Sequence, residues 1–216
     1  MAISEFIAYR GGARERCALG NGRPTFFLKK PDPESIREFL AAQKSRQCSY
    51  EHMGASRTAA PPGYVVDHNR IQLGKGRSAF ARAKDAIKQW KMFDIAWLQL
   101  FWPDTAIEAG ATVAILISHL GFWSLHAARV VYTVEEERGA LETYGFAYGT
   151  LPDHAEMGEE RFSVEFHPGD ESVWYDLCAF SRPHLLARMA FPYTRALQKK
   201  FAADSKLAMQ RAVGRA

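Results

Sequence analysis

The stretch over residues 150–160 gathers polar side chains that could carry chemistry. Its members are His154, Glu156, Glu159 and Glu160. A histidine beside carboxylates can bind a metal ion or serve as a general acid–base pair. The spacing matches neither an HExxH nor an HxH metal motif. The alternative is a polar hairpin connection whose acids cap turns and pair with Arg161 or Arg182.

Glu160 and Arg182 are expected to lie close together. Glu160 begins one predicted strand and Arg182 ends the next, and antiparallel neighbours place such ends side by side. An ion pair there would seal the mouth of the sheet or hold a polar group of a ligand. His154, Glu160 and Arg182 are therefore the candidate catalytic residues.

Other reactive patterns in the chain are incomplete. His119 and His126 flank a predicted hairpin turn at 121–123, and we interpret each as a rim histidine. The sequence Gly74-Lys75-Gly76 precedes a predicted helix but lacks a full phosphate-loop pattern, which favours a plain strand-to-helix turn. No GxSxG elbow is present. The sequence therefore predicts no metal and no cofactor.

Composition sets broad limits on the class of protein. The chain has 216 residues, of which 47% are hydrophobic and 24% charged, enough for one core with an extension. The net charge of +4 is mildly basic, and no run of five like charges indicates nucleic-acid binding. Three separated cysteines form no disulfide framework, and the N-terminal residues contain no apolar signal segment. We expect a cytoplasmic protein.

Three alternating segments between Leu141 and Pro183 form the clearest structural pattern. Turn residues separate them, and the best alternation places Phe162, Val164 and Phe166 on one face. Further strands are predicted at 64–73, 97–102, 111–119 and 125–135, and a helix at 77–92. Successive strands without crossover helices indicate an antiparallel sheet.

A long helical pattern follows the last strand. Ser181 is a possible N-cap, Pro183 suits the first turn, and Pro192 predicts a kink or a restart. The order of strand, helix, about six strands and long helix predicts an α+β fold. In it, a curved antiparallel sheet of about six to seven strands grips the C-terminal helix, as in the START and Bet v 1-like helix-grip proteins. We expect an N-terminal extension over 1–62 and the helix-grip domain over 63–216.

Several motifs resemble those of uncharacterised protein family 0548. They are GFAYGTLPDHAEMGEERFSVEF (145–166), AFSRP (179–183), RVVYTVEE (129–136), GKGRSAFARAKDAIKQWKMF (74–93) and PPGYVVDHNRIQLG (61–74). The resemblance covers roughly residues 50–205. It implies no reaction, because the family has none assigned.

One predicted strand has a face of very small residues. Gly145, Ala147 and Gly149 alternate with large aromatic residues. This face allows either close packing of the terminal helix or room for a ligand. The residues expected to contact a ligand are Tyr132, Tyr148, Gly149, Thr150, Trp174 and Ser181.

Three functions stay open at this point. The first is binding of a small, mostly apolar molecule in a cavity between the sheet and the terminal helix. The second is an enzyme, such as a cyclase, dehydratase or hydrolase, acting on a hydrophobic substrate in that cavity. The third is a membrane-peripheral or partner-binding module that uses the basic residues of the terminal helix, although a solvated helix face is the simpler interpretation.

Overall fold

The computed structural model describes residues 25–139, 141–183 and 191–214. It begins with β1 (Phe26–Phe27), α1 (Pro33–Gln43) and the single-turn helix η1 (Ala55–Arg57). Next come β2 (Val65–Lys75), α2 (Gly76–Lys88), η2 (Lys91–Phe93), β3 (Leu98–Phe101) and β4 (Thr112–Ser118). The chain continues through β5 (Trp123–Arg138), β6 (Leu141–Thr150), β7 (Glu156–His167), β8 (Ser172–Pro183) and α3 (Phe191–Gly214).

The strands form one curved antiparallel sheet. Its order is β2-β8-β7-β6-β5-β4-β3, and the short β1 pairs with β5. The predicted fold class is confirmed, including the three strands between Leu141 and Pro183 and the long helix that follows them. Because neighbours in sequence are mostly neighbours in the sheet, hairpin turns suffice to connect β4 through β8.

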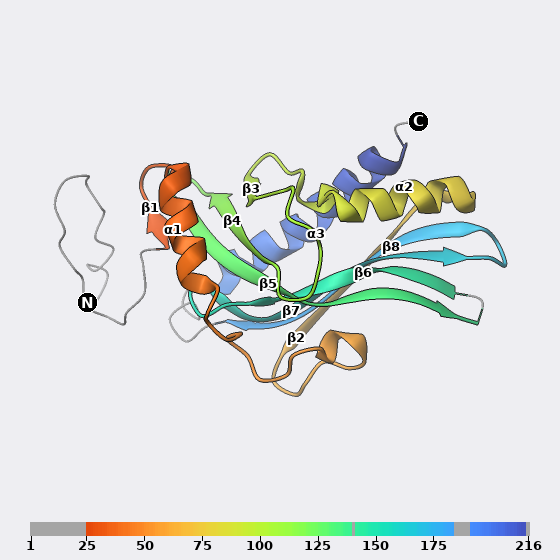
Figure 1. Cartoon of the computed structure of the whole chain (residues 1–216), viewed down its shortest axis with the longest axis horizontal. Helices are drawn as coiled ribbons and strands as arrows, with labels where there is room; N and C mark the ends of the chain where they lie inside the picture. The colour runs from red at the N-terminus through yellow and green to blue at the C-terminus, as the bar shows by residue number, and fades with distance from the viewer. Residues whose placement is uncertain (1–24, 140, 184–190, 215–216) are drawn as a thin grey trace.

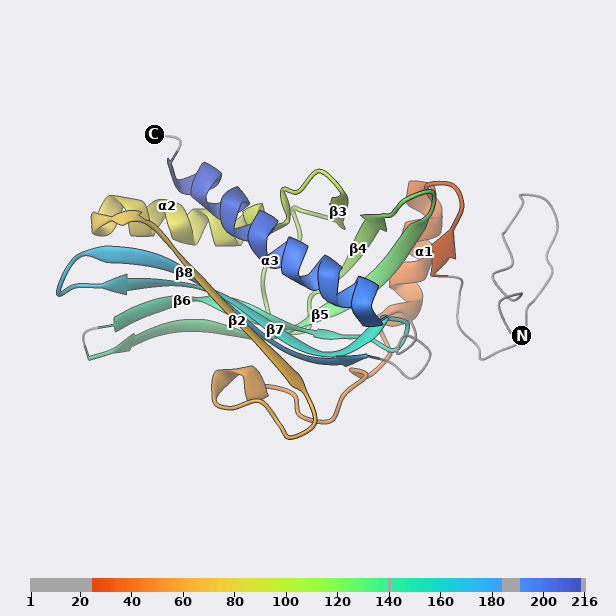
Figure 2. The ribbon, with the colours of Figure 1, turned by 180° about the vertical axis from the view of Figure 1, so that it is seen from behind.

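Helices α2 and α3 cover one face of the sheet, which we call the inner face (Figures 1 and 2). Phe146, Phe162 and Tyr175 point into this layer and are completely buried. Helix α3 contributes Met209 and Val213, which are also buried. Large side chains therefore fill the middle of the layer, and the predicted apolar cavity has no room there. Space for a ligand elsewhere between the sheet and α3 stays a prediction.

Helix α1 and the segment around η1 cover the opposite, outer face (Figure 1). Asp32 caps α1 by accepting a hydrogen bond of 2.9 Å from the backbone N–H of Ser35. Ile36 and Phe39 of α1 then pack with Leu116 and Leu125 of the sheet. The described part of the predicted extension is thus packed against the sheet.

The start of α3 differs from the sequence-based expectation. Ser181 and Pro183 belong to β8, where Pro183 pairs with Glu156, and so neither begins a helix. The predicted helical residues 184–190, like the lead-in at 1–24, lie outside the described residues. The described part of α3 runs from Phe191 to Gly214 and includes Pro192. The predicted kink or restart at Pro192 stays a prediction.

The glycine-rich turn before α2 is a plain strand-to-helix turn. Gly76 has a φ of 83°, which favours glycine, and it starts the helix directly after β2. Its N–H donates to the carbonyl of Glu171 at 2.8 Å. A backbone group of the β7–β8 connection therefore occupies a donor that a phosphate would need.

Candidate functional site

Glu160 lies on the inner face of β7 and carries the most unusual carboxyl group there. Its Oε2 accepts a hydrogen bond of 2.8 Å from the hydroxyl of Tyr148, the residue directly opposite on β6. The side chain is half-buried, and burial raises the pKa of the carboxyl to about 7, with a smaller contribution from Glu156. No lysine or arginine of the described residues forms an ion pair with it. Such a carboxyl can give or take a proton near neutral pH.

A second polar group on the inner face joins β7 and β8 to α3. Gln198 of α3 donates to the carboxylate of Glu156 and, at 3.0 Å, to the hydroxyl of Ser181. One turn earlier, Arg195 forms an ion pair with Asp67 of β2. Burial raises the pKa of Glu156. These polar contacts hold the first half of α3 over the sheet. The second half adds the buried Met209 and Val213, and a hydrogen bond of 2.9 Å between Ser205 and Tyr175.

A row of hydrogen bonds crosses the ends of β4 and β5 beneath the start of α3. The hydroxyl of Tyr193 lies 2.7 Å from His119 Nδ1, and His119 Nε2 lies 2.7 Å from Ser124 Oγ. Ser124 Oγ in turn lies 2.8 Å from His126 Nε2. We call Tyr193, His119, Ser124 and His126 the histidine–serine row. The ring of His154 lies beyond its end, with its centre 4.6 Å from that of His126.

The rings of these histidines are neutral at pH 7. Burial lowers the pKa of His119, and it lowers that of His126 further. Burial also lowers the pKa of His154 to about 4. His154 Nδ1 accepts a hydrogen bond of 3.1 Å from the N–H of Glu156, so its own proton resides on Nε2. His154 therefore acts as a neutral hydrogen-bonding group and not as a cation that pairs with Glu160.

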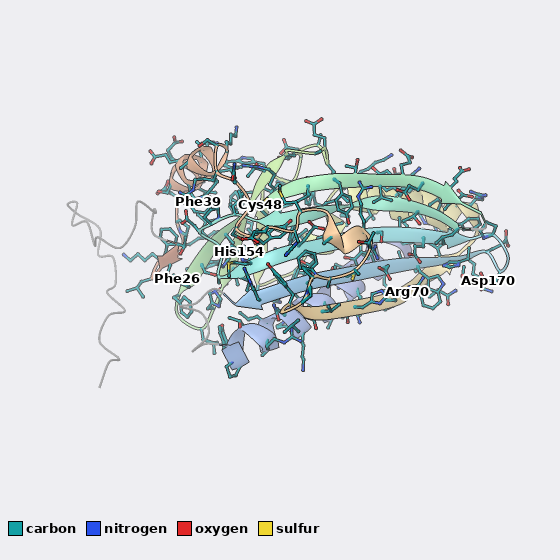
Figure 3. All side chains as sticks on the ribbon, turned by 90° about the horizontal axis from the view of Figure 1, so that it is seen from below. Phe26, Phe39, Cys48, Arg70, His154 and Asp170 are labelled. Atoms are coloured by element: carbon teal, nitrogen blue, oxygen red, sulfur yellow. The ribbon has the colours of Figure 1, made fainter. Side chains whose placement is uncertain are left out.

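Glu159 points to the outer face and has a structural role. It is 2% exposed, and its carboxylate accepts hydrogen bonds from Tyr50 Oη at 2.7 Å, Gly54 N–H at 2.7 Å and Ser56 N–H at 3.0 Å. The hydroxyl of Ser56 donates to it as well. These contacts fasten residues 50–56 across the sheet, and Figure 3 looks onto this face.

The small-residue face of β6 also points outward, contrary to the expectation that the terminal helix or a ligand would lie on it. Phe146 and Tyr148 point inward instead. A Cβ placed on Gly149 would lie 2.3 Å from Tyr50 Oη, so the N-terminal segment occupies the space that the glycine leaves. Tyr132, another predicted ligand residue, is buried under the same segment and bonds to Ser56 at 2.6 Å.

The structure separates the other predicted site residues. Arg182 is exposed, lies over the ring of Tyr64 and stands opposite Met157, so the predicted ion pair with Glu160 is not formed. Trp174 lies under the guanidinium of Arg70, whose position Figure 3 labels. Thr150 bonds to Ser49 at 2.7 Å. Of the predicted set, Tyr148, Ser181, Glu160 and His154 lie toward α3.

A hollow of about 680 Å³ opens on the surface beside the N-terminal segment. It is lined by Gln47, Cys48, Ser49, Tyr50, Glu51, Met53, Gly110, Arg129, Val130 and Val131. Arg129 is engaged by the end of α1, since it donates to the carbonyls of Gln43 at 2.9 Å and Arg46 at 2.7 Å. The guanidinium of Arg129 in this outer hollow therefore already has hydrogen-bond acceptors within the chain.

The described residues contain neither a metal-binding cluster nor a membrane-spanning helix. Within residues 25–139, 141–183 and 191–214, no three His, Cys, Asp or Glu side chains are grouped to hold a metal ion. None of the described helices is long and apolar enough to cross a bilayer. On α3, Arg195, Lys200 and Lys206 contact Asp67, Asp204 and Asn69 respectively, so these basic side chains have partners within the chain.

Sequence reasoning missed the histidine–serine row as a unit. Its members are separated by five, two and many more residues along the chain, a spacing that matches no motif. The β4–β5 hairpin places Ser124 opposite Ile117, and α3 adds Tyr193 from far along the sequence. Only alternation with Leu125 and Ala127, which pack under α1, could have indicated that Ser124 and His126 share the inner face.

The strand order and the long helix on the inner face define a helix-grip protein. Among solved structures, norcoclaurine synthase of Thalictrum flavum is 10% identical, with 76% of this chain and 95% of that chain covered and a TM-score of 0.39. The major latex-like protein 151 of Panax ginseng is 11% identical, with 68% and 96% covered and a TM-score of 0.40. These values are too low to bear on function, and the class rests on the topology of the chain itself.

The chain belongs to the family described as a domain of unknown function, DUF1990, whose model matches residues 49–208. A UPF0548 protein of Dictyostelium discoideum is 36% identical over 208 residues, covering 88% of this chain and 96% of that relative. A UPF0548 protein of Deinococcus radiodurans is 34% identical over 202 residues, covering 88% and 99%. The resemblance to uncharacterised protein family 0548 is confirmed.

Proposed function

We propose that the protein binds a small molecule at the end of the inner layer, beneath the first half of α3. The observation that carries this proposal is Glu160, a half-buried inner-face carboxyl with no basic partner among the described residues. The hydroxyl of Tyr148 donates one hydrogen bond to the Glu160 carboxyl. The other lone pairs of this carboxyl can still accept hydrogen bonds. A ligand with a hydroxyl or amino group would supply the missing donor.

The apolar part of such a ligand has a surface to contact. Ala179 stands opposite Glu160 on β8 and is half-buried, as is Phe201 of α3. Phe201 packs at the edge of the apolar core, with its ring centre 5.5 Å from that of Phe93. Apolar side chains that stop short of full burial beside a few polar groups are typical of small-molecule sites.

Acid–base catalysis is a second candidate function of the same site. The pKa of Glu160 near 7 favours it, because a general acid or base works best when its pKa lies near the working pH. Strongly shifted pKa values also concentrate at functional sites. In this case Glu160 would move the proton, and Tyr148 would position its carboxyl.

A thermal-shift experiment with arylalkyl alcohols and amines tests the binding proposal. A ligand that binds the folded state raises the melting temperature in a saturable manner. We expect this rise in the wild type and in the control Glu137→Gln, which alters an exposed acid, but a smaller rise in Glu160→Gln and Tyr148→Phe. Equal stabilisation of Glu160→Gln and wild type by every compound would contradict the proposal.

A further inference from the structure

The histidine–serine row ends at a buried nitrogen to which the described residues offer no hydrogen-bond partner. His126 is 5% exposed, and no hydrogen-bond partner for its Nδ1 is found among the described residues. A buried polar atom of this kind is uncommon and calls for a missing partner. The other end of the row is Tyr193 on α3, a residue that is 43% exposed. The row therefore runs from a solvent-exposed hydroxyl to a buried ring nitrogen.

The protons of the histidine–serine row can be arranged in two self-consistent ways, which are its two states. A neutral imidazole carries one N–H, and the hydroxyl of Ser124 can donate to one ring only. If Tyr193 donates to His119, then His119 donates to Ser124, Ser124 donates to His126, and His126 Nδ1 carries a proton. If every bond is reversed, His126 Nδ1 has a bare lone pair. In both states, His119 and His126 carry their protons on different ring nitrogens.

His154 does not change this count. Its Nδ1 already accepts from the N–H of Glu156, and no hydrogen bond joins its ring to that of His126. Because Ser124 is completely buried, water does not reach the centre of the row. The state of His126 Nδ1 is therefore set through Ser124 and His119.

We propose that the histidine–serine row relays protons between the Tyr193 hydroxyl and His126 Nδ1, and that Nδ1 contacts a hydroxyl group of the bound molecule. In the relay, the hydroxyl of the bound molecule gives its proton to the bare Nδ1 of His126, while His126 Nε2 passes its proton to Ser124. Ser124 passes its own proton to His119 Nε2, His119 Nδ1 passes one to Tyr193, and Tyr193 passes one to water. One proton is thus transferred in total: the bound molecule is left as an oxyanion, water becomes hydronium, and every group in the row ends neutral. The contact with a ligand rests on the proposed function, whereas the relay does not.

Nitrogen-15 NMR of protein labelled in its histidines tests the relay without a ligand, because long-range proton–nitrogen correlations show which ring nitrogen is protonated. At pH 7, we expect His119 and His126 to be neutral and to carry their protons on different ring nitrogens. Ser124→Ala should abolish this coupling, while Ser124→Thr, which keeps the hydroxyl, and the control Ser118→Ala should preserve it. The same protonated nitrogen in both rings of the wild type, or a charged ring, would overturn the relay.

Phenol serves as the probe for the ligand contact. We expect saturable movement of the His126 Nδ1 resonance in the wild type, and binding about two- to tenfold weaker in Ser124→Ala, the range for one lost hydrogen bond. If phenol shifts Tyr148 and Glu160 but leaves His126 unchanged, the contact with the row is wrong while the proposed function stands. If phenol shifts none of these residues, both fail.

Discussion

Glu160 and Glu159 are adjacent in β7, yet their environments assign them different roles. Glu159 accepts several hydrogen bonds on the outer face from residues 50–56, whereas Glu160 accepts one from Tyr148 on the inner face. Alternation along a strand is enough to separate them. A satisfied carboxylate fastens a segment, and an under-satisfied carboxyl with a raised pKa is available for a ligand.

The free energy of unfolding should depend on pH through Glu160. Its pKa is raised from 4.5 to about 7, so its stabilising contribution is fully present below pH 4.5 and is lost as the pH rises through 7. Glu160→Gln removes this loss, and the variant should gain on the order of 3 kcal/mol relative to the wild type between pH 4.5 and 8. Urea unfolding across this range measures it.

A comparison of variant with wild type isolates this effect from that of His154. The pKa of His154 is lowered to about 4, so its contribution is present above 6.5 and is lost as the pH falls through 4 in both proteins. Glu137→Gln should follow the wild type throughout. A Glu160→Gln variant with the same pH dependence as the wild type would show that Glu160 has an ordinary pKa.

Loss of the Glu159 carboxylate should destabilise the outer face. Glu159→Gln places an amide N–H₂ among donors that need an acceptor, which should lower the free energy of unfolding by about 2–3 kcal/mol. Tyr50→Phe removes one of these bonds and should cost less. Chemical denaturation of both variants measures these free energies of unfolding. An unchanged value for Glu159→Gln would contradict the anchoring role of Glu159.

At the scale of elements, residues 50–56 and β6 are fitted to each other. The Cβ of an alanine at position 149 would lie 2.3 Å from Tyr50 Oη, closer than van der Waals contact allows. Gly149→Ala should therefore displace Tyr50 and lower the free energy of unfolding, typically by 1–3 kcal/mol for overpacking.

A double-mutant cycle checks that Tyr50 is the cause. In a Tyr50→Ala background, the cost of Gly149→Ala should fall below about 0.5 kcal/mol, because the clash is gone. An equal cost in both backgrounds would place the strain of Gly149→Ala elsewhere.

The sequence predicted the elements better than the faces they present. Alternation of apolar and polar residues, together with turn residues, is sufficient to predict β6, β7 and β8, because both signals are local in the sequence. Alternation does not show which face turns inward when both faces are covered. The small face of β6 is therefore expected to receive the terminal helix or a ligand, whereas Phe146 and Tyr148 occupy the inner face instead. Glu160 and Arg182 were paired by strand ends, but they belong to opposite faces.

The whole molecule combines a packed half with a polar half. Helices α2 and α3 close the inner layer over Phe146, Phe162 and Tyr175, and this arrangement follows from element order. The polar end beneath the start of α3 depends on contacts between distant residues, such as Tyr193 with His119 and Gln198 with Glu156. Such contacts leave no local pattern, which is why the site was only partly predictable.

An NMR screen of small aromatic alcohols and amines against the wild-type protein tests the central claim most directly. We predict that the compounds that bind will shift backbone and side-chain resonances of Tyr148, Glu160, Ser181 and Gln198, the residues beneath the first half of α3. Shifts confined to Cys48, Tyr50 and Arg129 would place the ligand in the outer hollow and contradict the account, as would the absence of binding by every compound.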